Sequence, residues 1–282
     1  LAGGRWVASG LRAFLAAGAC ARGGGRSALL ARAAASGDPT TPHLITAFNV
    51  LPESQRLPCS VGVRTCYSWE QEKGQLVVSG DSKLVRIWDA SQERVVSDMT
   101  YGAGPGCVVE SLSSDVSGHR LIVAGCTDGS VRLLDPRLPA DTARIMTLRE
   151  FGHPVRVHLQ PSCVDPRGRI VGCSSLDGLL KVWEPRNYKE PVSSWCVTDG
   201  GPILAMDVHS RAEIIACASP APAVQLYTFK GKLLNQIQFQ DGMMGQRIVE
   251  SESLRFHPYR LQLAAASRDT YVAVYGTPTS NL

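Results

Sequence analysis

A few histidine, cysteine and acidic side chains are the residues of this sequence that could bind a metal ion or transfer protons. His158, Cys163 and Cys173 carry side chains that bind zinc, but their spacing matches no known zinc pattern and predicted strands separate them. Asp207 and His209 alternate along one predicted strand and therefore share a face, yet no third group completes a catalytic set. We therefore predict no catalytic residue, no metal ligand and no cofactor-binding residue.

The nine cysteines indicate free thiols rather than a disulfide framework. Their number is odd, none forms a Cys-x-x-Cys pair, and Cys126, Cys173 and Cys217 lie on or beside predicted inner strands. Cysteine is among the residue types most often buried, and reduced thiols are typical of intracellular compartments. We expect buried, reduced cysteines in a cytoplasmic protein.

One short pattern, which reads Leu-Val-Arg-Ile-Trp-Asp in its first copy, predicts the elements that would position these residues. The five copies are Leu84–Asp89, Ser130–Asp135, Leu179–Glu184, Ala223–Thr228 and Tyr271–Gly276. The equivalent positions 88, 134, 183, 227 and 275 are separated by 46, 49, 44 and 48 residues. A period in the forties, with a strand that ends in Trp-Asp, predicts the blade of a β-propeller.

Each copy is accompanied by further predicted strands, so that four strands complete a blade. An apolar run precedes each copy, another strand precedes that run, and an outer strand follows most copies. Short apolar runs bounded by turns suit strands that are buried on both faces. We therefore predict an all-β propeller with five visible repeats, the last without an outer strand. The repeats cover about residues 61–99, 107–148, 155–196, 203–239 and 253–276.

The turn before each copy is a hairpin signal in most repeats. Asp128-Gly129 and Asp177-Gly178 are typical of tight hairpins, and Asp81-Ser82 and Arg268-Asp269 occupy the same place. The fourth repeat has Pro220-Ala221-Pro222 there. Because proline has no N–H to donate and fixes its own φ, we expect that hairpin to be built differently.

The third repeat resembles WD-repeat proteins most fully, because Gly152-His153 precedes Asp177-Gly178 and Trp183-Glu184. The resemblance implies that His153 and Asp177 join a hydrogen-bonded network with the Trp183 indole; a catalytic His-Asp pair is the alternative. A buried polar group without a partner costs about 1–3 kcal/mol, which favours the structural network. The residues assigned to the blade motif are Asp81, Trp88, Asp89, Asp128, Asp135, His153, Asp177, Trp183, Glu184, Tyr227, Asp269 and Tyr275.

The net charge of +4 is set by the first part of the chain. Residues 1–37 contain five arginines and no acid, which leaves 24 basic and 25 acidic residues, a net charge of −1, in residues 38–282. The predicted propeller is thus nearly neutral, and its charge gives no argument for a nucleic-acid partner. The chain has no run of about 18 apolar residues, so no membrane span is predicted.

Residues 1–43 do not share the repeat pattern and are predicted to be a flexible Ala/Gly/Arg-rich segment outside the propeller. This segment lacks the GxxxxGK pattern of a phosphate-binding loop. Its composition is similar to that of a mitochondrial transit peptide, although the chain starts with Leu1; an incomplete or imperfectly joined sequence is the other interpretation. Residues 44–50 then form a lone predicted strand. The propeller is assigned to residues 44–276 and a tail to residues 277–282.

Several less repetitive stretches resemble the C-terminal propeller of the Raptor family, the regulatory-associated proteins of the TOR kinase. The most specific is Asp241-Gly242-Met243-Met244-Gly245-Gln246-Arg247, followed by Leu254-Arg255-Phe256-His257-Pro258. Trp69–Glu72 and Leu121–Gly125 look like the same family. The signature residues assigned on this basis are Asp241, Gly242, Met244, Gly245, Gln246 and Arg247.

The Raptor resemblance implies a non-catalytic scaffold or adaptor in TOR complex 1, with the TOR kinase and other proteins of that complex as partners. It also implies a cytoplasmic location, with recruitment to the lysosomal surface through the complex. The alternative is an unrelated WD-repeat adaptor, targeted to mitochondria by residues 1–37. Raptor's propeller has seven blades, so five repeats predict an open or strained arc, unless residues 45–50 pair with the fifth repeat.

Loops that depart from the repeat are the predicted partner-contacting regions, because loops tolerate change and carry function. These loops are Gly102–Gly106, Pro185–Pro191 and Gln240–Arg247. The Met243-Met244 pair is either an exposed contact site or tucked under the last blade, and the sequence does not decide between the two.

Overall fold

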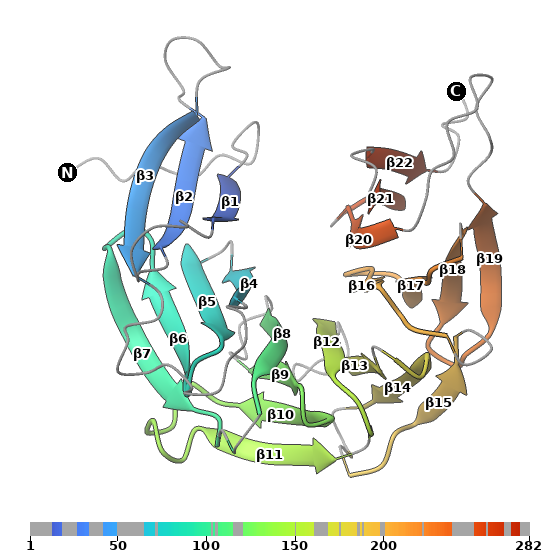
Figure 1. Ribbon diagram of the computed structural model, residues 1–282, viewed down its shortest axis with the longest axis horizontal. Coiled ribbons are helices and arrows are strands. Elements are labelled where there is room, and N and C mark those ends of the chain that lie inside the picture. Colours follow the sequence, from blue (N-terminus) through green and yellow to red (C-terminus); the bar gives the residue numbers. More distant parts are fainter. Residues whose placement is uncertain are drawn as a thin grey trace.

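The computed structural model shows an all-β propeller of six antiparallel sheets (Figure 1). Within the described ranges, no helix has the length and apolar character needed to cross a membrane. Residues 13–18, 27–33 and 42–49 are described as strands only. The other described residues are 65–70, 73–102, 104, 107–114, 121–149, 151–160, 169–174, 176–184, 187, 189–197, 201–221, 223–238, 251–257, 259–267 and 272–276.

Four sheets are complete blades, each built from four consecutive strands. Blade 1 consists of β4 (Thr65–Glu70), β5 (Gln75–Gly80), β6 (Leu84–Asp89) and β7 (Arg94–Thr100). Blade 2 consists of β8 (Val109–Ser114), β9 (Ile122–Cys126), β10 (Ser130–Leu134) and β11 (Arg144–Arg149). Blade 3 consists of β12 (Val155–Gln160), β13 (Arg169–Ser174), β14 (Leu179–Trp183) and β15 (Ser193–Cys196). Blade 4 consists of β16 (Ala205–Val208), β17 (Ile214–Ala218), β18 (Ala223–Thr228) and β19 (Leu233–Gln238).

Blade 5 has three strands in the described part of the chain, as its repeat predicts. They are β20 (Ser251–Phe256), β21 (Gln262–Ser267) and β22 (Val272–Gly276). The recurring pattern forms the third strand of every blade, namely β6, β10, β14, β18 and β22. The predicted propeller, with its motif strand at the same place in each repeat, is confirmed.

The N-terminal sheet differs from the prediction. Strands β1 (Ala13–Gly18), β2 (Ser27–Ala33) and β3 (Pro42–Asn49) pair in the order β1-β2-β3. Most of residues 13–43 was predicted to be flexible, and residues 44–50 were predicted to be a lone strand. Although the segment is rich in alanine, glycine and arginine, it contains apolar runs, such as Ala-Phe-Leu-Ala-Ala-Gly, that are long enough to pair as strands.

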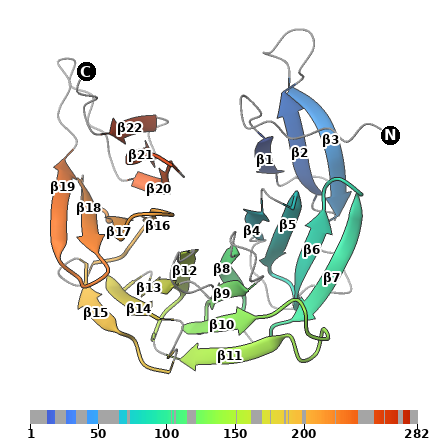
Figure 2. The ribbon, with the colours of Figure 1, turned by 180° about the vertical axis from the view of Figure 1, so that it is seen from behind.

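The six sheets stand side by side in an open arc (Figure 1, and from behind in Figure 2). The first strand of each blade faces the middle of the arc, and β7, β11, β15 and β19 form its outer rim. The N-terminal sheet and blade 5 are the two ends of the arc. Strand β3 pairs with β2 rather than with β22, so closure of the ring through residues 45–50 is not observed.

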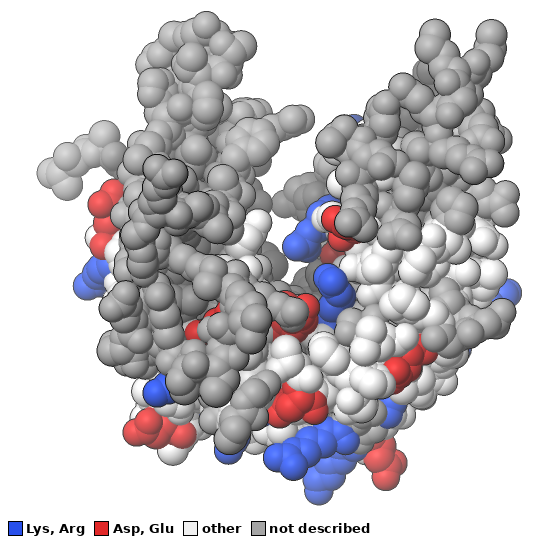
Figure 3. Space-filling model, viewed as in Figure 1, with Lys and Arg blue, Asp and Glu red and all other residues white. Residues whose placement is uncertain are grey.

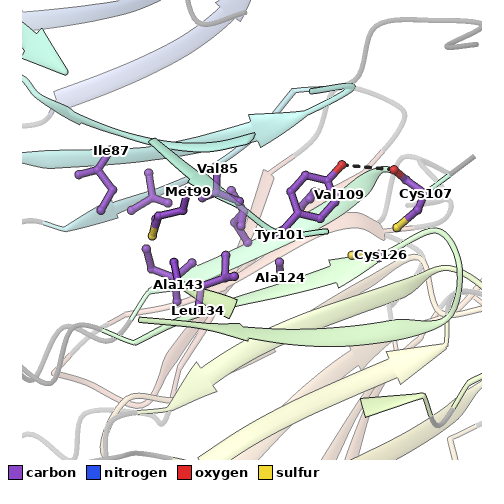
Figure 4. Packing of buried hydrophobic residues seen from close by; sticks show 13 residues of the cluster. Val85, Ile87, Met99, Tyr101, Cys107, Val109, Ala124, Cys126, Leu134 and Ala143 are labelled. Carbon is purple, nitrogen blue, oxygen red and sulfur yellow. Dashed lines mark hydrogen bonds between the residues drawn. The ribbon is translucent and has the colours of Figure 1, made fainter. Parts of the chain in front are cut away.

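The apolar core is divided into layers, and each layer lies between two consecutive blades. Figure 4 shows the layer between blades 1 and 2, where Val85, Ile87 and Met99 face Val109, Leu134 and their neighbours. Side-chain hydrogen bonds cross the same junctions near the middle of the arc. Ser68 bonds to Ser114 at 2.9 Å between blades 1 and 2, and Ser111 donates to the Val155 carbonyl at 3.2 Å between blades 2 and 3.

The outer face of blade 5 is the exception to this layered burial. Val85 and Ile87 of β6 are 0% and 5% exposed, and the equivalent residues of β10 and β14 are equally buried. Val272 and Val274, at the same positions of β22, are 69% and 68% exposed. The difference arises because a following blade covers β6, β10 and β14, and no described strand covers β22.

The hairpins before the motif strands follow the predicted chemistry. Gly129 and Gly178 have φ values of 79° and 66°, the left-handed conformation that glycine adopts without a Cβ clash. The proline-containing hairpin of blade 4 is built differently, with the Ala223 N–H donating to the carbonyl of Ala221 at 2.7 Å. Gly129 also lies against the backbone of Phe151, so a side chain there has no space.

Substitutions at equivalent valines should measure the interblade burial. We expect Val85→Ala to lower the free energy of unfolding by about 2 kcal/mol, because it removes buried methyl groups and leaves a cavity. The matched change Val272→Ala should stay within about 0.5 kcal/mol, as is usual for an exposed site. Urea unfolding of the purified chain measures both. Equal losses at the two positions would show that β22 is covered in solution.

The close approach of Phe151 to Gly129 in the blade 2 hairpin can be tested by comparing substitutions at Gly129 and at a second glycine with a similar backbone conformation. Gly74 also has a positive φ, 63°, but a Cβ there would meet no atom within 4 Å. We expect Gly129→Ala to cost about 1–3 kcal/mol more than Gly74→Ala, because only the first adds a clash to the backbone strain. Thermal unfolding of the two variants gives the difference, and similar melting temperatures would contradict it.

Candidate protein-interaction surface

The aromatic residues that end the motif strands belong to the blade core. Trp183 is completely buried, and the ring of Phe151 meets it edge-on with 6.0 Å between the ring centroids. Tyr227 is buried as well, and its hydroxyl donates to the carbonyl of Val197 at 2.8 Å. Trp88 and Tyr275 take the same place in blades 1 and 5 and are partly buried. These side chains pack within and between the sheets.

His153 and Asp177 lie together, as the third repeat predicts, but the indole of Trp183 does not join them. The His153 Nε2 atom is 3.0 Å from Asp177 Oδ1, and the two side chains are 46% and 41% exposed. The Trp183 Nε1 atom is buried without an acceptor among the described residues. The pair therefore links the start of blade 3 to its β13–β14 hairpin at the surface, a structural position.

The acidic residues after the motif strands organise the turns that follow. Asp89 accepts hydrogen bonds from the Ser91 hydroxyl at 2.6 Å and from the Ser91 N–H at 2.8 Å. Asp135 binds the guanidinium of Arg137 at 2.6 Å. The bond from Ser91 lowers the pKa of Asp89, and the bond from Arg137 lowers the pKa of Asp135. Glu184 is 3.7 Å from Arg169 of the neighbouring strand.

The acidic residues before the motif strands have different surroundings. Asp81 is buried at the β5–β6 hairpin. Asp128 binds the buried Arg132 at 2.8 Å, and although burial opposes ionisation, hydrogen bonds from Ser130 lower the pKa of Asp128. Asp269 lies outside the described residues, as does the entire signature stretch 241–247. Their assigned roles stay predictions.

The residues first considered for chemistry hold blades together where the structure describes them. The carboxylate of Asp207 accepts the N–H of Phe256 at 2.6 Å, which joins blade 4 to blade 5. The His209 ring contacts the Arg260 carbonyl at 3.2 Å and accepts the N–H of Ala212 at 2.8 Å. The side chains of His158 and Cys163 are outside the described part. The expected free, buried thiols are confirmed for Cys126, Cys173 and Cys217.

The uncovered face of β22, defined by Val272 and Val274, is the best candidate for an interaction surface. Large exposed apolar patches on otherwise polar surfaces mark protein contact sites. In blades 1 to 4 the same face is occupied by the apolar face of another sheet, so the repeat itself indicates what kind of structure fits β22. Single exposed apolar residues on the rim, such as Val96 and Leu234, are ordinary for a protein surface.

Both signs of charge occur on the face that Figure 3 shows, where acidic and basic residues of the described part lie among neutral ones. Of the three loops predicted to contact partners, 240–247 lies outside the described residues, and 102–106 and 185–191 are described only in part.

Sequence reasoning missed the exposure of β22, since Val-Ala-Val-Tyr reads like the buried motif strands. It also missed a role for the basic residue in the middle of those strands. Arg86 makes two bonds of 2.7 Å to Asp98 of the outer strand, and Arg132 is buried at the junction of blades 1 and 2. The repeated position of Arg86, Arg132 and Lys181 in the pattern was the available signal.

Comparison with known proteins gives several relatives that are named as Raptor or as subunits of target of rapamycin complex 1. No protein-family model matches the sequence. The protein raptor homolog of Dictyostelium discoideum is 29% identical over 239 residues, which are 83% of this chain and 15% of that protein. The target of rapamycin complex 1 subunit mip1 of Schizosaccharomyces pombe is 32% identical over 212 residues, 74% of this chain and 16% of that protein.

Comparison with solved structures supports the propeller fold. The crystal structure of Chaetomium thermophilum Raptor matches with a TM-score of 0.73 and 24% identity, over 89% of this chain and 22% of that one. The chain thus spans about a sixth of the length of the curated relatives that it matches. The sequence similarity over most of the chain identifies it as a relative of the Raptor proteins.

Proposed function

We propose that this propeller serves as a non-catalytic adaptor module of a TOR complex 1 assembly. The observation that carries the proposal is the similarity to proteins named as Raptor or as subunits of target of rapamycin complex 1, which extends over most of the chain. The TOR kinase and the other proteins of that complex are the proposed partners, and the cytoplasm, with recruitment to the lysosomal surface through the complex, is the proposed location.

A scaffold role agrees with how the described polar residues are used. Histidine and aspartate are the residue types from which acid–base sites are made, but here their contacts are structural. His153 with Asp177 joins a strand to a hairpin, and Asp207 and His209 contact the neighbouring blade. A catalytic group must instead lie within reach of a substrate atom. A rigid array of sheets with its edges and one apolar face presented outward suits protein contacts.

The face of β22 is the proposed contact of this module with another β-sheet. Its two valines occupy positions that blades 1 to 3 bury against the next sheet. The apolar face of a sheet is therefore the partner structure whose shape and chemistry match, and covering it would extend the arc by one layer. Such a contact leaves the outer rim of blades 1 to 4 open for further proteins.

Membership in the complex can be tested by capture from cells. The tagged chain is expressed in eukaryotic cells depleted of their own Raptor, so that the native subunit does not compete, and captured proteins are identified by mass spectrometry. We expect the TOR kinase to be enriched over a control with an unrelated WD-repeat propeller that carries the same tag. Recovery of a folded chain, shown by cooperative thermal unfolding, without enrichment of the kinase would refute the proposal.

A further inference from the structure

Two cysteines and an aspartate meet at the junction of blades 1 and 2, away from the surfaces considered so far. The Sγ atoms of Cys107 and Cys126 and a carboxylate oxygen of Asp128 all lie within 4.8 Å of one another. Cys126 ends β9, opposite Val109 of β8, and Cys107 comes two residues before Val109. Because side chains alternate along a strand, this register places both thiols on the same face (Figure 4).

Arg132 of β10 fixes this cluster. Its Nη2 atom donates to the Cys107 sulfur at 3.0 Å and to Asp128 at 2.8 Å. Its Nη1 atom donates to the carbonyl oxygens of Tyr101 and Gly102, both at 2.6 Å. A buried guanidinium with this many fixed bonds stays charged and in place. The Cys107 sulfur therefore sits beside a permanent positive charge.

The two thiols have different ionisation properties as a result. A hydrogen bond from Cys126 and the charge of Arg132 lower the pKa of Cys107, although burial opposes them. The bond to Cys107 and burial raise the pKa of Cys126, which therefore keeps its proton. The thiolate, not the thiol, is the reactive form of cysteine. Of the two thiols, Cys107 is therefore the one that ionises more readily.

Two cysteines and an aspartate could also bind a metal ion, but the positive charge of Arg132 opposes this. The guanidinium already neutralises Asp128 and contacts the sulfur of Cys107. A zinc ion at these ligands would lie next to a buried positive charge that it could not displace without breaking the bonds to Tyr101 and Gly102. The arrangement suits redox chemistry of the thiols better than metal binding.

We propose that Cys107 and Cys126 form a redox-sensitive pair that a peroxide converts to a disulfide. The Cys107 thiolate attacks one oxygen of hydrogen peroxide, the O–O bond breaks, and hydroxide leaves and takes a proton from the solvent. Cys107 is now a sulfenic acid. Cys126 passes its proton to the oxygen of the sulfenic acid and attacks the Cys107 sulfur as a thiolate; the S–O bond breaks, and water leaves as the S–S bond forms. The dithiol loses two electrons, and the peroxide is reduced to water.

The position of Cys107 makes this step mechanically possible and gives it a consequence. Cys107 precedes β8, so its sulfur can approach Cys126 without breaking the ladder between β8 and β9. Its carbonyl accepts the hydroxyl of Tyr101 at 3.2 Å (Figure 4). The same hydroxyl donates to the Ser82 carbonyl of blade 1 at 2.7 Å. Disulfide formation ties to Cys126 the sulfur that accepts the Arg132 hydrogen bond, and so changes the contact between blades 1 and 2.

The test exposes the purified whole chain to hydrogen peroxide, blocks the remaining thiols with an alkylating reagent, and maps the peptides by mass spectrometry. We expect a Cys107–Cys126 disulfide. Cys173, completely buried in blade 3, is the internal control, because burial raises its pKa to about 12. Since each unit of pKa changes the thiolate population about tenfold, Cys107 should be oxidised at least about ten times faster than Cys173.

Cysteine-to-serine variants, which change the side-chain size little, separate the two steps of the reaction. Cys126→Ser should stop the reaction at a Cys107 sulfenic acid that dimedone traps, and Cys107→Ser should abolish both products; thermal unfolding confirms that each variant is folded. Oxidation of Cys173 before Cys107, or a disulfide that involves other cysteines, would overturn the proposal. Zinc that copurifies with the chain and is lost in Cys107→Ser would also overturn it, because the cluster would then be a metal site.

Discussion

Burial of each blade's apolar face against the next blade is the interaction on which this structure depends. An isolated four-stranded sheet has two faces and cannot bury either alone, so the blades are stable only as a stack. The core accordingly lies between the sheets, in layers that combine the second, third and fourth strands of one blade with the strands of its successor. The hydrogen bonds of Ser68, Ser111 and Asp207 lie at these same junctions.

This dependence explains both features that carry the functional argument. A stack that is not closed has end faces, and the two valines of β22 are exposed at one of them. The Arg132 cluster, in contrast, is buried because it lies inside a junction, where the low dielectric makes a fixed positive charge act strongly on a neighbouring sulfur. Stacking of the blades thus leaves the face of β22 available for a partner and places the Arg132 cluster in a buried junction.

Much of the fold could be predicted because the repeat is a local signal. The motif strand appears in every blade where the pattern placed it, and the Asp-Gly hairpins adopt the backbone conformation that glycine allows. The N-terminal sheet could not be predicted in the same way. Its strands have the composition of a flexible segment, and only their pairing with one another reveals them as a sheet.

The site was less accessible from the sequence than the fold. Val272 of β22 and Val85 of β6 occupy the same place in the pattern, and their difference in exposure depends on whether another sheet follows in space. Cys107 and Cys126 come from different strands, and Arg132 from a third. Alternation and turn residues act locally, so they sufficed to predict the blades and their order, while the less repetitive stretches carry the resemblance to Raptor. The exposed faces and the thiols that meet a charge depend on contacts between segments far apart in the chain, so these features emerge only in the folded protein.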